Sequence, residues 1–132
     1  MSPVARTIEG NASRSDQGSP LARPSFKGDG GPAVDAQIDA PEAVALDRAG
    51  NLLVADAVNQ RVRVVAVTTG TFYGRKMTAG HIYTVAGGGG SIGDGGPATS
   101  AELDFPQDAI AAGNGGLLIA DTFNGRVRLV SG

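Results

Sequence analysis

The chain has 132 residues, 18% of them charged, with a net charge of -2 and a sequence pI of about 5.2. This is the length of one ordinary domain, and the slightly acidic balance argues against a nucleic-acid partner, because proteins that bind nucleic acids carry a basic surface. Cysteine is absent, which excludes disulfides and thiol chemistry, and the sequence shows neither a membrane-spanning apolar run nor an apolar export leader, so we expect no membrane partner and, by default, a cytoplasmic location.

Residues 1–27 are predicted to form an irregular N-terminal segment. Within it, "RTIEGN" at residues 6–11 is a weak copy of "YTVAGG" at residues 83–88 and is therefore a candidate outer strand. Residues 12–26, which follow, are rich in Ser, Pro and Gly and have no apolar periodicity, which is typical of a loose connection.

From residue 28 onward the sequence repeats itself. Residues 28–65 align with residues 93–130 without a gap at an offset of 65, and 19 of the 38 aligned positions are identical. A fixed period with turn residues between short apolar runs is the signature of a solenoid or a propeller. We therefore expect a first repeat at residues 28–92 and a second at residues 93–132.

Each repeat contains short apolar runs of strand length, separated by turn-forming tetrads of the Asn/Gly kind. The first repeat has a fourth such run, "HIYTVAG", and the second repeat ends without its counterpart. This pattern predicts an all-β fold of four-stranded antiparallel meanders, the blades of a β-propeller, with an incomplete ring of about two blades. The expected strands lie at residues 43–47, 52–56, 61–65 and 81–87, and at residues 109–113, 117–121 and 126–130.

Two long motifs carry a resemblance to a known family. "PEAVALDRAGNLLVADAVNQRVRVV" and "FPQDAIAAGNGGLLIADTFNGRVRLV" resemble NHL repeats of the bacterial type, and "TVAGGGGSIGDGGPATSAEL" is similar to their linker between blades. The chain departs from the family at Ala43 and Asp108, where Gly is usual, and at Ala112 and Gly116. The resemblance implies a β-propeller that acts as a binding scaffold.

The hexapeptide "GDGGPA" opens both repeats, at residues 28–33 and 93–98. A phosphate loop would need a following helix and a Lys, and a calcium loop would need several oxygen donors, whereas each copy offers a single carboxylate. The favoured interpretation is a structural turn in which Gly supplies positive φ and Asp29 or Asp94 accepts hydrogen bonds from neighbouring amides.

A second recurring group follows the second strand of each repeat. Asp56 closes a strand three residues before Asn59, and Arg61, two residues further on, can reach the same carboxylate. Because the trio recurs as Asp121, Asn124 and Arg126, we expect it to lock the turn rather than to catalyse. The alternating Arg side chains of these strands are expected to keep their heads in water, and a basic stripe for phosphate backbones is the alternative.

One segment of the first repeat has no counterpart in the second repeat. It is "TTGTFYGRKMTAGHIY", between the third and fourth strands. Aromatic, Met and Arg groups on an exposed loop are typical of protein contact sites. The alternative is an extended hairpin whose apolar side chains cover the blade edge. The candidate interaction residues are Phe72, Tyr73, Arg75, Lys76, Met77 and His81.

The sequence predicts neither catalytic residues nor a metal or cofactor, because one His and no Cys cannot build a three-ligand site. The expected function is a non-catalytic NHL-repeat scaffold that binds a protein or a ligand; the alternatives are part of a propeller lyase or hydrolase with a central metal, and an RNA-binding propeller. Expected partners are another protein, the rest of a longer propeller, or further copies that close a ring, for example a trimer. In such a ring the strand near residues 6–11 could complete the neighbour's second repeat.

Overall fold

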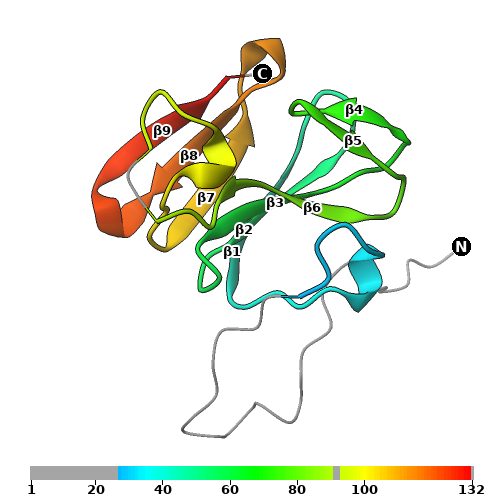
Figure 1. The fold of residues 1–132 in the computed structure, drawn as a ribbon, viewed down its shortest axis with the longest axis horizontal. Coiled ribbons are helices and arrows are strands. Elements are labelled where there is room, and N and C mark those ends of the chain that lie inside the picture. The colour runs from blue at the N-terminus through cyan, green and yellow to red at the C-terminus, as the bar shows by residue number, and fades with distance from the viewer. Residues whose placement is uncertain (1–26, 91–92, 132) are drawn as a thin grey trace, which may run out of the picture.

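The computed structural model describes residues 27–90 and 93–131, which form an all-β arrangement of antiparallel sheets (Figure 1). The candidate strand near residues 6–11 lies outside the described residues. One sheet has the order β1-β2-β3-β6, a second has the order β7-β8-β9, and a small hairpin, β4-β5, joins β3 to β6. Each large sheet is built from one repeat of the sequence.

The first repeat folds into a four-stranded meander. Its apolar and β-branched runs form the strands, and the fourth strand predicted at residues 81–87 is confirmed as β6. The inner strand begins two residues earlier than predicted, at a proline. The elements are η2 (Ala33–Asp35), β1 (Pro41–Leu46), β2 (Leu52–Asp56), β3 (Arg61–Val65), β4 (Gly70–Phe72), β5 (Arg75–Met77) and β6 (Ile82–Gly87).

The second repeat reproduces the first three strands at the same offset of 65 residues. Its linker carries one turn of 3-10 helix, as the first linker does, and two further turns of this kind lie between its strands. The elements are η3 (Ala98–Ser100), β7 (Pro106–Ala111), η4 (Gly113–Gly115), β8 (Leu117–Asp121), η5 (Thr122–Asn124) and β9 (Arg126–Val130).

The same irregularity occurs at the start of the first strand of each repeat, in β1 and in β7. The register shifts after Pro41, which lies opposite Asp56, and after Pro106, which lies opposite Asp121. Proline is tolerated here because it stands at the first position of an edge strand. The residue before each proline has a φ of +52°, at Ala40 and at Phe105. The repeat therefore extends to the backbone conformation even where the side chains differ.

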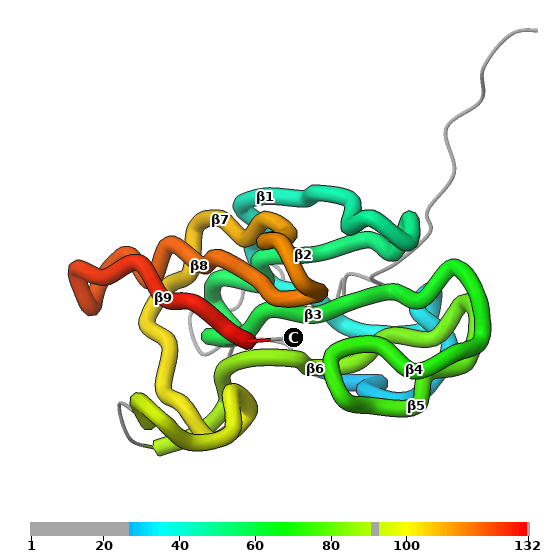
Figure 2. The backbone as a smooth tube through the Cα atoms, turned by 90° about the horizontal axis from the view of Figure 1, so that it is seen from above, coloured from blue at the N-terminus to red at the C-terminus, as the bar shows by residue number. Residues whose placement is uncertain are grey.

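The two sheets pack face to face through the inner strand of the second repeat. β7 contacts β1, β2 and β3, and Figure 2 shows β1 and β7 side by side. We call the face of the first repeat that packs against the second repeat its front face, and we use the same name for the equivalent face of the second repeat. The opposite face of each repeat is its back face. Front-face residues of the first repeat, such as Leu53 and Val64, form one core with back-face residues of the second, such as Ala109 and Ile119.

The outer part of the back face of the first repeat, at β3 and β6, is covered by the repeat's own linker. Ala33 and Ala36 of this linker pack against Val65 and Ile82 in a separate apolar cluster. Likewise, the linker of the second repeat, with η3, packs against β6 (Figure 2). The second linker also contacts the repeat that follows it, because Asp94 pairs with Arg128 at 3.0 Å, as Asp29 pairs with Arg63 in the first repeat.

Candidate functional site

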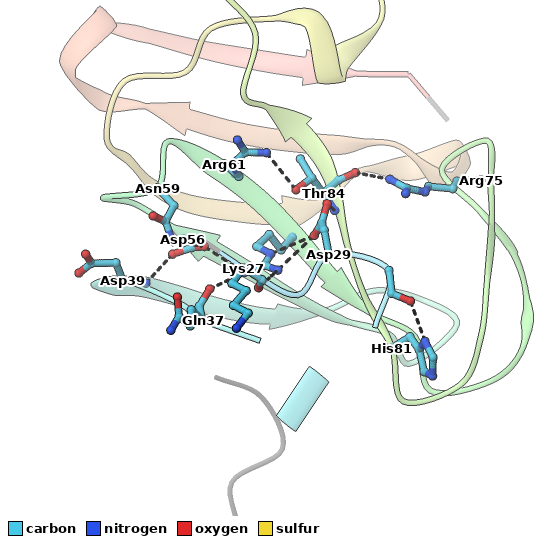
Figure 3. A network of polar contacts seen from close by, with 12 residues as sticks. Lys27, Asp29, Gln37, Asp39, Asp56, Asn59, Arg61, Arg75, His81 and Thr84 are labelled. Carbon is cyan, nitrogen blue, oxygen red and sulfur yellow. Dashed lines mark hydrogen bonds and ion pairs between the residues drawn. The ribbon is translucent and has the colours of Figure 1, made fainter. Parts of the chain in front are cut away.

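The carboxylate of Asp56 is the centre of a buried polar network in the first repeat (Figure 3). It accepts hydrogen bonds from the backbone amide of Asp39 at 2.8 Å and from the side-chain amide of Asn59 at 2.9 Å. Burial raises the pKa of the Asp56 carboxyl above its ordinary value, and these two donors oppose that rise. The predicted turn-locking contact between Asp56 and Asn59 is present.

Asp56 pairs with the guanidinium of Arg63, at 3.4 Å. From the sequence we had expected Arg61 in this place. The side chain of Arg63 is 0% exposed, so the expectation that its head lies in water is wrong. The physical reason is the linker, which lies over this face and supplies Asp29 at 3.1 Å together with the backbone carbonyls of Gln37 and Lys27. Arg61 donates instead to the hydroxyl of Thr84 at 3.4 Å.

The second repeat contains the same network. Asp121 accepts hydrogen bonds from the backbone amide of Asp104 at 2.7 Å and from Asn124 at 3.0 Å, and it pairs with Arg128 at 3.7 Å. Arg128 also pairs with Asp94 at 3.0 Å. Arg126, which the sequence placed in this role, is exposed. These ion pairs have a structural role, because the donors and acceptors of their side chains contact other residues of the same repeat.

The first "GDGGPA" copy acts as a clamp rather than as a local turn alone. Gly28 and Gly30 have φ values of +88° and +83°, as the turn interpretation required. However, among the contacts of the described residues, the Asp29 carboxylate has none with a neighbouring amide. It accepts a hydrogen bond from the backbone N–H of Thr84 at 2.9 Å and forms an ion pair with Arg63. The loop thus ties the linker to β3 and β6.

The aromatic and Met side chains of the predicted interaction loop pack within the first repeat. Met77 is buried in the main core, and Phe72 and Tyr73 pack against it. The Tyr73 hydroxyl donates to Asp47 at 2.7 Å. These contacts are those of the hairpin alternative, in which β4 and β5 cover the edge of the blade.

The polar side chains of the same loop are only in part engaged. The Arg75 guanidinium lies 5.0 Å from the centre of the Tyr83 ring and donates to the backbone carbonyl of Thr84 at 3.2 Å. His81 Nδ1 lies 2.8 Å from the carbonyl oxygen of Gly30. Lys76 is exposed. Of the six candidate interaction residues, Arg75 and Lys76 are the ones that present an exposed surface.

The largest unpartnered apolar groups lie on the two outward faces of the pair of repeats. On the front face of the second repeat, Val127 is 77% exposed and Leu129 is 67% exposed. On the back face of the first repeat, Val44 is 61% exposed and Leu46 is 68% exposed. Both outward faces of the pair of repeats therefore carry exposed apolar side chains.

A groove of about 840 Å³ runs along the outer edge of the second repeat. It is lined by β9 and the following Ser131, by the second "GDGGPA" copy, and by Tyr73 and Val85 of the first repeat. Of the residues that line this groove, Tyr73 is the one that the sequence had placed among the candidate interaction residues.

Within the described residues there is no group of three or more His, Cys, Asp and Glu side chains that could hold a metal ion. In the same part of the chain, no helix has the length and apolar character needed to cross a membrane.

Comparisons with known proteins add a likeness of fold. No protein-family model and no curated protein matches the sequence. Among solved structures, the chain is similar to an auxiliary nutrient binding protein from Bacteroides ovatus, with a TM-score of 0.58 and 20% sequence identity over 81% of this chain. The chain spans 26%, about a quarter, of the length of that protein. At this identity the likeness concerns the arrangement of strands alone.

Proposed function

We propose that the chain is a segment of about two blades of an NHL-type β-propeller and that it serves as a non-catalytic binding scaffold. The observation that carries the proposal is the way its two repeats stack. Inside the chain, the front face of the first repeat packs against the back face of the second, and the two outward faces are the equivalent back and front faces. The solved protein with a similar fold is described as a nutrient binding protein, which supports a binding role for such a fold.

The front faces of the two repeats differ in burial although their positions are equivalent. Val62 and Val64 are fully buried where the second repeat packs on them, whereas their counterparts Val127 and Leu129 are exposed. Exposed apolar patches of this kind mark interaction sites in soluble proteins. The front face of the second repeat is therefore suited to receive another blade.

The back faces show the complementary difference. Ala109 is buried against the first repeat, while its counterpart Val44 is exposed. A contact between the front face of one copy and the back face of the next is heterologous, and such contacts generate a closed ring when the rotation allows it. Because propellers have about four to eight blades, three copies with two blades each form a ring of ordinary size.

The acidic groups of the repeats support the non-catalytic part of the proposal. Asp56 and Asp121 are fully buried, and each accepts two hydrogen bonds and an ion pair within its own repeat. A general acid or base must reach a substrate, and these side chains are committed to their own turns.

The proposal is tested by the mass of the full chain in sedimentation equilibrium at micromolar concentration. We expect a multiple of the chain mass of 13.2 kDa for the unmodified protein. Ile110→Lys places a charge on the front face of the second repeat, where Ile110 is now 48% exposed, and should weaken association about tenfold or more because a lysine would be buried against another blade.

The control is Ala79→Lys, which adds the same charge at an exposed position of the loop between β5 and β6. It should leave the mass unchanged. A monomeric mass for the unmodified chain, or equal masses for the chain and the Ile110→Lys variant, would overturn the proposal.

A further inference from the structure

A cavity of about 450 Å³ lies where the two repeats meet, at the end of the sheets opposite the buried networks of Asp56 and Asp121. It is bordered by the turn between β1 and β2 at residues 47–49, by the β4-β5 hairpin at residues 71–74, and by the connection from β7 to β8 at residues 111–116. Its volume is within the range of sites that bind small molecules. The cavity is formed by both repeats together.

The two repeats differ at this cavity. In the first repeat, the Asp47 carboxylate accepts hydrogen bonds from the backbone amide and the side-chain amide of Asn51, at 2.8 Å and 3.0 Å. The equivalent residues of the second repeat are Ala112 and Gly116, which line the cavity and carry no polar side chain. These are two of the positions at which the sequence departs from the NHL pattern. The second repeat therefore lacks the side-chain pair that braces this turn in the first, and larger side chains there would occupy part of the cavity.

The apolar part of the wall comes from the hairpin and from β7. Phe72 and Tyr73 are half-buried: they pack against the main core and also line the cavity. The Tyr73 hydroxyl donates to Asp47 at 2.7 Å, which fixes the hairpin over the turn between β1 and β2. Ala111 and Ala112 line the cavity from the second repeat. Aromatic rings and methyl groups of this kind suit a flat apolar group.

The charged group of the wall that is available to a ligand is the guanidinium of Arg48. Arg48 is exposed and lines the cavity, and it forms no hydrogen bond or ion pair in the part of the chain that the structure describes. The Asp47 carboxylate, by contrast, already accepts three hydrogen bonds from Asn51 and Tyr73. Because a guanidinium pairs with a carboxylate through two parallel hydrogen bonds, Arg48 favours a carboxylate ligand.

The charges around the cavity also favour an anion. Residues 47–49, 71–76 and 111–116 include the cations Arg48, Arg75 and Lys76 and the single carboxylate of Asp47. The whole chain, in comparison, has a net charge of -2. A local excess of positive charge attracts anionic ligands.

We propose that this cavity binds a small aromatic carboxylate, whose carboxylate pairs with Arg48 and whose ring lies against Phe72 and Tyr73. The inference rests on the proposed binding role and adds a site and a ligand class to it. It does not depend on the association of copies, because the cavity lies within one chain.

The test uses phenylacetate as the probe and follows the amide resonances of the isotope-labelled full chain by NMR. We expect saturable shifts concentrated at residues 71–74 and 112–116 at millimolar concentrations of the probe. Benzyl alcohol keeps the ring without the charge, and acetate keeps the charge without the ring. Each should bind at least about tenfold more weakly than phenylacetate, because each lacks one of the two contacts.

Two pairs of variants make the test specific. Arg48→Gln should raise the Kd for phenylacetate at least about tenfold, whereas Arg126→Gln, which changes an exposed arginine at the other end of the sheet, should leave it unchanged. Ala112→Asp places a competing carboxylate beside the cavity and should abolish binding. Ala79→Asp, at an exposed position outside the cavity lining, should not. The NMR spectrum of each variant shows whether it is folded.

Absence of localised shifts with phenylacetate, equal binding of acetate, or an unchanged Kd in Arg48→Gln would each overturn the inference. A multimeric mass without phenylacetate binding would contradict this site alone and would leave the stacking of blades intact. Binding that depends on Arg48 in a chain of monomeric mass would support the site, while that mass would contradict the proposed stacking.

Discussion

Arg63 connects three segments of the first repeat, because it pairs with Asp29 of the linker, with Asp56 at the end of β2, and lies on β3. Replacing it with methionine keeps much of the apolar stem and leaves Asp56 buried without its cation. Breaking a buried ion pair in this way costs about 3–5 kcal/mol. We predict a loss of this order for Arg63→Met in the free energy of unfolding, measured by urea denaturation.

The matched substitution in the second repeat is Arg128→Met. Of its two partners, Asp94 is largely exposed, so water can solvate that carboxylate, and the buried Asp121 lies 3.7 Å from the guanidinium, farther than Asp56 lies from Arg63. The loss for Arg128→Met should therefore be clearly smaller than that for Arg63→Met. Equal losses would show that the linker clamp does not contribute to the stability of the first repeat.

Tyr73 should give the protein an alkaline pH dependence. Burial, together with its hydrogen bond to the Asp47 carboxylate, raises the pKa of the Tyr73 hydroxyl above its ordinary value of 10.0. Because the unfolded chain then loses this proton before the folded chain does, the free energy of unfolding should fall as the pH rises above about 10.

In Tyr73→Phe this part of the decline should be missing, although the variant loses the hydrogen bond to Asp47 at every pH. The measurement is urea denaturation of both proteins at about pH 8 and about pH 10.5. If the two proteins lose the same free energy between these pH values, the Tyr73 hydroxyl does not ionise differently in the folded and unfolded states.

At this scale the sequence predicted some polar contacts and missed others. The spacing of Asp56 and Asn59 is local, and the turn between them brings the two side chains together as expected. The choice between Arg61 and Arg63 is not local, because both lie on the same strand. It depends on the linker, which covers Arg63, and on the pairing of β2 with β3, which places Arg63 opposite Val54.

Among the elements, β6 is the one most dependent on a single glycine. Gly87 ends the strand with positive φ, close to the Gln60 backbone, so any side chain there meets both strain and a clash. We predict that Gly87→Ala lowers the free energy of unfolding by more than about 1 kcal/mol. Gly90→Ala, at a position with open space around it, should change stability little.

Thermal unfolding followed by far-UV circular dichroism compares the two variants. Gly87→Ala should unfold at a lower temperature than Gly90→Ala. A melting temperature for Gly87→Ala that matches the unmodified chain would contradict the requirement for glycine at the end of the fourth strand.

Strands were predicted well from the sequence where the apolar runs are bounded by Gly and Asn turns, as at β2, β3, β8 and β9. The inner strands begin earlier than predicted, at Pro41 and Pro106, because a register shift lets a proline open the strand. The hairpin β4-β5 was one of two alternatives, since the packing of Met77 under it depends on residues distant in the sequence.

In the whole molecule, the sequence repeat explains why the exposed faces are equivalent to the faces that are buried between the two repeats. Each repeat has the same alternation of front and back residues, and the internal contact between repeats uses one front face and one back face. The remaining front and back faces are exposed and belong to opposite sides of the pair. The exposed faces are thus equivalent to the two faces that pack together within the pair, and a contact between them would be heterologous.

The central claim is that these outward faces bind further blades of the same kind. The most direct measurement is the mass of the unmodified full chain by light scattering at micromolar concentration. We predict a closed assembly with a mass that is a whole multiple of 13.2 kDa, three chains for a six-bladed ring. A stable mass of 13.2 kDa at this concentration would contradict it.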